Sequence, residues 1–133
     1  MTVKLHFYYK TTEIISETLT LTNGSSTQFS NVPIYNESDT RIGTATFDDS
    51  LQITNGNSSA FVTELGTYFI DTLGCAGYLY SFTSASDNIR FPLGSTITTE
   101  IIIKGGIYEG YKGNIIINVV DTVFRNITIE IFV

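Results

Sequence analysis

The stretch EIIIKGGIYEGYKGNIIINVV, residues 100–120, places two runs of three isoleucines on either side of a glycine-rich segment. A β-strand with one wet face alternates apolar and polar residues, because successive side chains point to opposite faces. Neither run, residues 101–103 nor residues 115–117, alternates. Both faces of these two predicted strands therefore need cover, and few folds provide it.

The rest of the chain is rich in β-branched and aromatic residues, and turn-forming pairs recur at short intervals, which is typical of an all-β protein. Alternation is clearest near the N-terminus, where Val3, Leu5, Phe7 and Tyr9 form one apolar face. We expect strands over residues 2–9, 12–22, 41–49, 76–84, 96–104, 113–121 and 126–133, and strands on both sides of the Asn55-Gly56 turn. The segments 22–31 and 85–95 are expected to be loops.

About eight antiparallel strands in meander order can form a closed barrel or a two-sheet sandwich. We predict an all-β fold, a single eight-stranded antiparallel closed barrel similar to the calycins, in one domain over residues 1–133. On such a barrel the outward isoleucines of residues 101–103 and 115–117 predict association into a homo-oligomer, a dimer or a trimer. The alternative is that a loop or a terminal segment of the same chain covers them.

Charge and composition exclude several classes of function. The chain has 7 Lys and Arg residues against 13 Asp and Glu residues and a net charge of −6, so a nucleic-acid partner is not expected. One histidine, His6, and one cysteine, Cys75, are too few for a clustered metal site or an internal disulfide. No apolar run approaches the roughly 18 residues of a membrane-spanning helix, and no signal peptide is recognisable. We therefore expect a cytoplasmic protein with no membrane partner.

Three segments resemble the superfamily of allene oxide cyclase and dirigent β-barrels. KGGIYEGYKGNIIIN resembles the glycine and aromatic pattern that leads into a long apolar strand of that family, at Gly105, Gly106, Tyr108, Gly110 and Gly113. FSNVPIYNESDTRIGTATF is similar to a family loop and the strand after it, at Phe29, Asn31, Tyr35, Arg41, Ile42 and Gly43. GTYFIDTLGCAGYLYSF, a weaker match, has two aromatic strands around a glycine turn. Together the segments cover about half of the chain.

This resemblance implies a barrel that binds a small, largely apolar or aromatic molecule and acts as a cyclase or isomerase. It implies Asn31 as the foremost polar group of the lumen, placed to position a substrate oxygen or a water, with Tyr35 and Asp49 next. The cyclases carry a glutamate in the first strand, where this chain has KLHFYY. The resemblance therefore implies the fold and the kind of reaction but not the substrate.

The residues themselves add candidates for chemistry. Paired carboxylates for acid–base work could come from Asp48, Asp49, Glu64 or Asp71. An inward Asp49, close to Arg90 or to a tyrosine, would have a raised pKa in an apolar lumen, whereas a solvated strand end would leave it without a role. Tyrosines could line a lumen that accepts an unsaturated ligand, or could fill it as an aromatic core. The predicted ligand-binding residues are Tyr9, Tyr68, Tyr78, Tyr80 and Arg90.

We therefore predict a cyclase or isomerase that needs neither a cofactor nor a metal and that speeds ring closure by orienting its substrate. Two alternatives remain open. One is a non-catalytic barrel that assembles as a structural subunit, and the other is a carrier of a small apolar ligand. A lumen of roughly 300 Å³ or more would favour the enzyme or the carrier over the structural subunit.

Overall fold

The computed structural model describes residues 1–21, 24–54, 59–85 and 93–133. These residues form an all-β protein, in which nine strands make one antiparallel sheet and a short 3₁₀ turn, η1 (Thr11–Glu13), follows the first strand. The strands are β1 (Thr2–Lys10), β2 (Ile15–Leu21), β3 (Gly24–Tyr35), β4 (Arg41–Thr54), β5 (Ser59–Ile70), β6 (Gly74–Ala85), β7 (Thr96–Ile103), β8 (Lys112–Val119) and β9 (Phe124–Phe132). No helix within the described ranges is long and apolar enough to cross a membrane.

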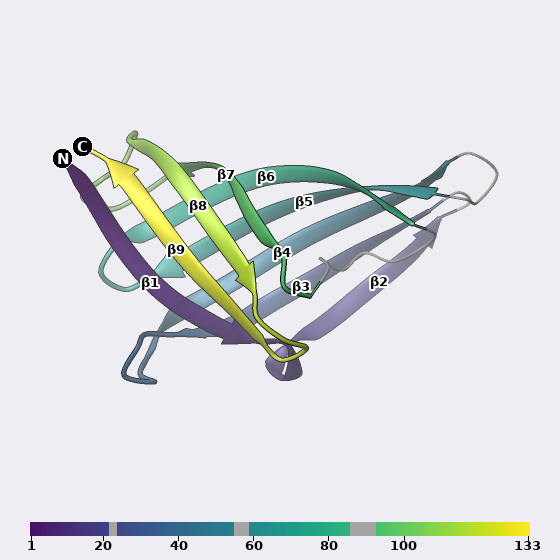
Figure 1. Ribbon diagram of the computed structural model, residues 1–133, viewed down its shortest axis with the longest axis horizontal. Helices are drawn as coiled ribbons and strands as arrows, with labels where there is room; N and C mark the ends of the chain where they lie inside the picture. The colour runs from purple at the N-terminus through teal and green to yellow at the C-terminus, as the bar shows by residue number, and fades with distance from the viewer. Residues whose placement is uncertain (22–23, 55–58, 86–92) are drawn as a thin grey trace.

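The sheet closes on itself as a barrel, which confirms the predicted fold class. Its strand order is β1-β9-β8-β7-β6-β5-β4-β3-β2, and β1 also pairs with β3. The ring therefore contains eight strands, β1 and β3 to β9, while β2 pairs with β3 outside the ring (Figure 1). The two termini lie side by side at one end of the barrel, because β1 and β9 are antiparallel neighbours.

The isoleucine runs are explained by this closure. Ile101 and Ile103 of β7 and Ile115 and Ile117 of β8 point inward and are buried. Ile102 points outward and is 42% exposed. In each run, isoleucines that face the interior therefore alternate with isoleucines that face outward. The glycine-rich segment between the two runs forms the turn from β7 to β8.

Side-chain contacts support the closing pair of the ring, Tyr8 with Tyr35. Their rings stack with centroids 5.3 Å apart, and Lys10 Nζ lies 5.4 Å from the centroid of Tyr35. The Tyr8 hydroxyl donates to Asp39 Oδ1 at 2.6 Å, and the Tyr35 hydroxyl donates to Glu13 Oε2 at 2.7 Å. The bond to Asp39 raises the pKa of Tyr8 to about 12, and the bond to Glu13 raises the pKa of Tyr35.

Two predictions of local structure were wrong. Residues 24–31, expected to be a loop, belong to β3, because this polar segment pairs with β2 on one side and with β4 on the other. The expected strand over residues 12–22 begins only at Ile15, after η1. The predicted Asn55-Gly56 turn and Arg90 lie outside the described residues.

The strands of the barrel differ in length, and this difference positions the candidate site. β3 to β6 have 12 to 14 residues, whereas β7 to β9 have 8 or 9. Among the described residues β6 pairs with β7 only at Ala76 with Ile103 and Gly77 with Ile102. Beyond Gly77 the long strands continue as a sheet that is not paired with β7 and is edged by β2, and the inner face of this part of the sheet carries the candidate site (Figure 1).

Gly66 of β5 makes room for an aromatic ring in the interior. It is paired with Tyr78 of β6, and a Cβ at this position would lie 2.2 Å from Tyr78 Cε1. The Tyr78 ring therefore lies directly against the backbone of Gly66, a contact that any larger residue would prevent.

We predict that Gly66→Ala destabilises the barrel by roughly 1–3 kcal/mol, because the added methyl group must displace the buried Tyr78 ring. Urea unfolding measures the effect. Gly105→Ala is the matched control, since its Cβ would meet Cys75 Cβ at an ordinary 3.7 Å. Equal stability of the two variants would contradict this account of Gly66.

The outer face of β5, β6 and β7 carries an apolar surface that we call the outer patch: Phe61, Leu65, Phe69, Leu79 and Ile102. Leu65 and Leu79 are cross-strand partners, and Leu79 is 61% exposed. Exposed clusters of this kind are typical of contacts between subunits.

We predict a closed homo-oligomer. Because Ile102 belongs to the outer patch, we expect the contact between subunits to include the whole of that patch. Light scattering at micromolar concentration should give the mass of a dimer or a trimer. The double variant Leu79→Glu/Ile102→Glu should lower that mass to one chain, because burying a carboxylate in the contact is costly. Val120→Glu, at an exposed loop position, should not. A monomeric wild-type protein would refute the prediction.

Candidate functional site

Two carboxylic acids lie side by side on the inner face of the long strands. Asp49 of β4 and Glu64 of β5 are cross-strand partners, 5% and 9% exposed. Alternation places Asp49 inward along with Phe47 and Leu51, so its sequence neighbour Asp48 points outward. Asp48 is exposed and accepts a hydrogen bond from Gln28 Nε2 at 3.0 Å. The pair Asp48-Asp49 is therefore divided between the two faces of the sheet.

Aromatic side chains surround the two acids. The Tyr78 hydroxyl donates to Glu64 Oε2 at 2.6 Å, within the buried interior. Tyr68 stacks on Tyr78 with centroids 6.0 Å apart, and its ring also meets Phe47 edge-on at 5.8 Å. Tyr9 of β1 lies 5.2 Å from Phe47. The acids thus lie in a wall of tyrosine and phenylalanine.

Burial keeps a proton on this pair at neutral pH. Desolvation, followed by the charge of Glu64, raises the pKa of Asp49 to about 9. Desolvation also raises the pKa of Glu64, while hydrogen bonds from Asp49 and Tyr78 act in the opposite direction. Because Glu64 receives both of these bonds, Asp49 holds the proton and Glu64 is the member closer to ionisation.

Two polar atoms of this region lack a hydrogen-bond partner among the described residues: Asp49 Oδ1 and the Tyr68 hydroxyl. Burial raises the pKa of Tyr68, and the nearby hydroxyl of Tyr78 acts in the opposite direction, although the Tyr68 hydroxyl has no hydrogen-bond partner among the described residues. Buried polar atoms are almost always paired, so such an atom points to a ligand, a water or a reaction. This is the feature that makes the interior more than an apolar core.

A buried cation lies on the opposite side of the interior. Arg125 of β9 is the cross-strand partner of Tyr9, and its Nη1 donates to the carbonyl oxygens of Asp121 and Phe124 at 2.6 and 3.2 Å. The positive charge of Arg125 acts to lower the pKa of Tyr9, whereas the negative charges of Glu64 and Asp49 act to raise it. The net effect on Tyr9, led by desolvation, is a pKa far above its usual value.

The structure divides the predicted site residues into two groups. Asp49, Tyr9, Tyr68 and Tyr78 are buried together in the interior, and Tyr80 is half-buried against the same core. This grouping is compatible with both alternatives, a lumen that accepts a ligand and a filled aromatic core, and a role in binding or catalysis stays a prediction. Arg90 falls in a segment outside the residues that the structure describes.

The expected placement of Asn31 in the lumen was wrong. Asn31 lies at a β-bulge in β3, between the pairs Phe29 with Phe47 and Val32 with Ala45. Its φ of 54° is in the left-handed region, which asparagine tolerates better than most residues. The bulge leaves its side chain exposed rather than facing the barrel interior.

Tyr35 was also wrongly expected in the lumen. Its neighbour Ile34 is the inward, buried residue at this point of β3, so Tyr35 lies on the outer side of the barrel. There it stacks on Tyr8 and donates to Glu13, contacts that belong to barrel closure.

Arg125 and the pairing of Asp49 with Glu64 were not predicted from the sequence. Arg125 precedes the strand predicted from residue 126, but it shares a face with Ile127, Ile129 and Ile131. Extending that alternation by two residues would have found it. The acid pair depends on the register between β4 and β5, which no local pattern encodes.

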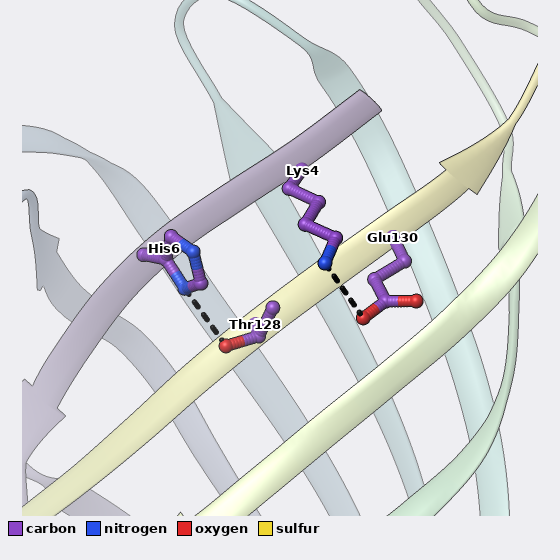
Figure 2. A network of polar contacts seen from close by, with 4 residues as sticks. All are labelled: Lys4, His6, Thr128 and Glu130. Carbon is purple, nitrogen blue, oxygen red and sulfur yellow. Dashed lines mark hydrogen bonds and ion pairs between the residues drawn. The ribbon is translucent and has the colours of Figure 1, made fainter. Parts of the chain in front are cut away.

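His6 lies on the outer face of the barrel and does not face the interior. Its Nδ1 is hydrogen-bonded to Thr128 Oγ1 at 2.9 Å across β1 and β9, next to an ion pair of Lys4 Nζ with Glu130 Oε1 at 3.8 Å (Figure 2). A shallow hollow of about 300 Å³ adjoins His6 and Glu37 on this surface. No group of three metal-binding side chains occurs within the described part of the chain.

Fold and site together define a small antiparallel β-barrel with an acid pair set in an aromatic interior. Solved structures that share this fold include three enzymes. AbnU, an exo-specific intermolecular Diels-Alderase, has a TM-score of 0.66 at 13% identity, over 98% of this chain and 97% of its own. The Diels-Alderase AbmU from Streptomyces koyangensis has a TM-score of 0.66 at 10% identity, over 98% of this chain and 63% of its own.

The third structure is a nonspecific heme-binding cyclase that catalyses a 4 + 2 cycloaddition during neoabyssomicin biosynthesis. Its TM-score is 0.66 at 9% identity, over 100% of this chain and 67% of its own. No protein family matches the sequence, and no curated protein is similar to it. The likeness therefore establishes the barrel fold of known cyclases, and not allene oxide cyclase in particular.

We predict that Asp49 makes the stability of the protein fall with rising pH. Its folded pKa of about 9 lies above its usual value of 3.8, so the folded state binds this proton more tightly than the unfolded chain does. Its stabilising contribution is complete below about pH 4 and is lost as pH rises toward about 9. A tenfold difference in proton affinity between the two states corresponds to about 1.4 kcal/mol, and we expect a decrease of at least about 2 kcal/mol between about pH 5 and 8.

Asp49→Asn should remove most of this slope in urea unfolding measured as a function of pH, because an amide does not titrate. Asp48→Asn, at the exposed neighbouring position, should keep the wild-type slope. The same slope in all three proteins would show that Asp49 does not carry a raised pKa.

Proposed function

We propose that this protein is a cyclase or isomerase that binds a small, largely apolar and reactive molecule inside the barrel. The observation that carries the proposal is an interior of stacked aromatic rings that contains two buried polar atoms without partners among the described residues, Asp49 Oδ1 and the Tyr68 hydroxyl. The fold shared with two Diels-Alderases and a further cyclase supports it.

Orientation is the main source of catalysis in this proposal. The faces of Phe47, Tyr68 and Tyr78 would pack against the unsaturated part of a substrate and hold its reacting ends together. Alignment of this kind can supply up to about 7–11 kcal/mol of the barrier without a covalent intermediate. Gly66 contributes indirectly, because it allows the Tyr78 ring to take its place.

The proposal assigns no step to a metal or another cofactor. The buried acids and tyrosines supply binding, orientation and exchangeable protons. The one histidine, His6, lies on the outer face of the barrel, and the proposal gives it no role.

A second function, a non-catalytic subunit that self-assembles, is favoured by the outer patch alone. The two proposals differ in what they require of the interior. A structural subunit needs no polar atom there, and it would bind no small molecule.

Incubation with a panel of conjugated dienes that carry an alkene partner tests the enzymatic proposal. We expect at least one compound to be converted to a cyclic isomer of unchanged mass, detected by chromatography and NMR. Ala76→Leu, which fills part of the interior next to Tyr68, should lower the rate at least about tenfold, because it displaces bound substrate.

Thr83→Leu, at an exposed position of the same strand, is the matched control and should keep the wild-type rate. A panel that shows neither binding nor conversion with the wild-type protein would favour the structural subunit instead.

A further inference from the structure

We propose that Asp49 and Glu64, with Tyr78, form a proton relay that accepts the O–H proton of an enol or phenol in the substrate. This inference rests on the proposed function and adds to it the chemical class of the substrate. The substrate would be an unsaturated apolar molecule with one acidic hydroxyl group conjugated to its reacting π system.

The relay follows the hydrogen bonds of the site. Tyr78 donates to Glu64 Oε2 at 2.6 Å, and the carboxyl of Asp49 lies next to Glu64 on the neighbouring strand, where a hydrogen bond between the two acids raises the pKa of Asp49 and acts to lower that of Glu64. Glu64 is thus the acceptor from two sides. Asp49 Oδ1, which is buried and has no partner among the described residues, remains to receive a hydrogen bond.

The hydroxyl of Tyr68 is a second polar group that could bind a ligand beside the acid pair. Tyr68 is fully buried, and its hydroxyl has no partner among the described residues. Its ring stacks on that of Tyr78, whose hydroxyl donates to Glu64, so Tyr68 lies next to the acid pair. A conjugated oxygen function could donate to Asp49 Oδ1, and Tyr68 could donate to a second oxygen acceptor of the same molecule.

The proton transfer conserves atoms and charge. The substrate O–H bond breaks and its proton binds Asp49 Oδ1, while the proton on the other oxygen of Asp49 moves to Glu64. The products of this step are a substrate oxyanion and a neutral Glu64, with Asp49 again singly protonated. The oxyanion donates electron density to its π system, which favours ring closure onto an electron-poor partner, and the proton then returns by the same route.

The pH dependence of the relay depends on every titratable group that faces it. The relay needs Glu64 ionised and Asp49 protonated, so its activity should pass through a maximum between their two pKa values. The groups that face or flank the pair are Asp48 on β4, Tyr78 on β6, Tyr68 on β5, Tyr9 on β1 and, through Tyr9, Arg125 on β9.

A probe pair tests the relay without knowledge of the substrate. 2-Naphthol offers an apolar ring system with an acidic hydroxyl, and 2-methoxynaphthalene has the same ring system without the proton. We expect the wild-type protein to bind 2-naphthol about tenfold more tightly. We also expect bound 2-naphthol to show the absorption band of its anion at neutral pH, where the free compound stays protonated.

Three variants separate the relay from simple binding. Asp49→Asn keeps an oxygen acceptor and should bind 2-naphthol within about threefold of the wild type, but it should lose the anion band because an amide does not relay protons. Glu64→Gln should lose the band as well, since the final acceptor is gone. Asp48→Asn is the control and should keep both the affinity and the band. Circular dichroism verifies that each variant is folded.

Several results would overturn the relay: absence of 2-naphthol binding, equal affinity for the two probes, or an anion band that persists in Asp49→Asn or Glu64→Gln. If Asp49→Asn does not fold, Glu64→Gln and the comparison of the two probes on the wild-type protein still decide the matter. A relay confirmed with 2-naphthol, together with no conversion of any diene, would refute the cyclase and leave the relay intact.

Discussion

The closure of one antiparallel sheet into a ring is the constraint on which the rest of this structure depends. A closed ring has an inside, and every second residue of each strand must be compatible with it. Between β1 and β3 the closure occurs at one residue pair, Tyr8 with Tyr35, which is supported by ring stacking and by hydrogen bonds to Asp39 and Glu13. Side chains therefore supplement the few backbone hydrogen bonds of this junction.

Closure also explains which parts of the fold could be predicted from the sequence. The alternation of Val3, Leu5, Phe7 and Tyr9 is local, and the structure has these residues on β1 as expected. The isoleucine runs identified two strands with apolar side chains on both faces. The predicted number of about eight strands agrees with the ring, although the predicted set included β2, which lies outside the ring, and omitted β3. These are properties of short segments, so a sequence alone reveals them.

The errors have a common physical cause, because each depends on a partner strand. Residues 24–31 look like a loop in isolation and become part of β3 because β2 and β4 pair with them. Asn31 was expected inside, but a bulge of one residue turned it outward. Likewise, Asp49 could be assigned to the interior from alternation, whereas its partner Glu64 emerged only from the register of β4 against β5.

The buried acids oppose stability, since each carboxyl group gives up its hydration on folding. The protein compensates in part by keeping a proton on Asp49 and by giving Glu64 the hydroxyl of Tyr78. An apolar pair at these positions would fold at least as well. The presence of two acids where leucines would pack is thus a reason to consider chemistry at this place rather than structure alone.

The interior of the barrel has two unlike walls. β7, β8 and β9 present branched aliphatic side chains, among them Ile101, Ile115 and Ile129, whereas β4, β5 and β6 present aromatic rings and the acids. A planar guest between these walls would have one face against inert hydrocarbon and the other against rings, hydroxyls and carboxyls. The two faces of such a molecule would no longer be equivalent, so the asymmetry of the barrel is by itself a source of stereochemical preference.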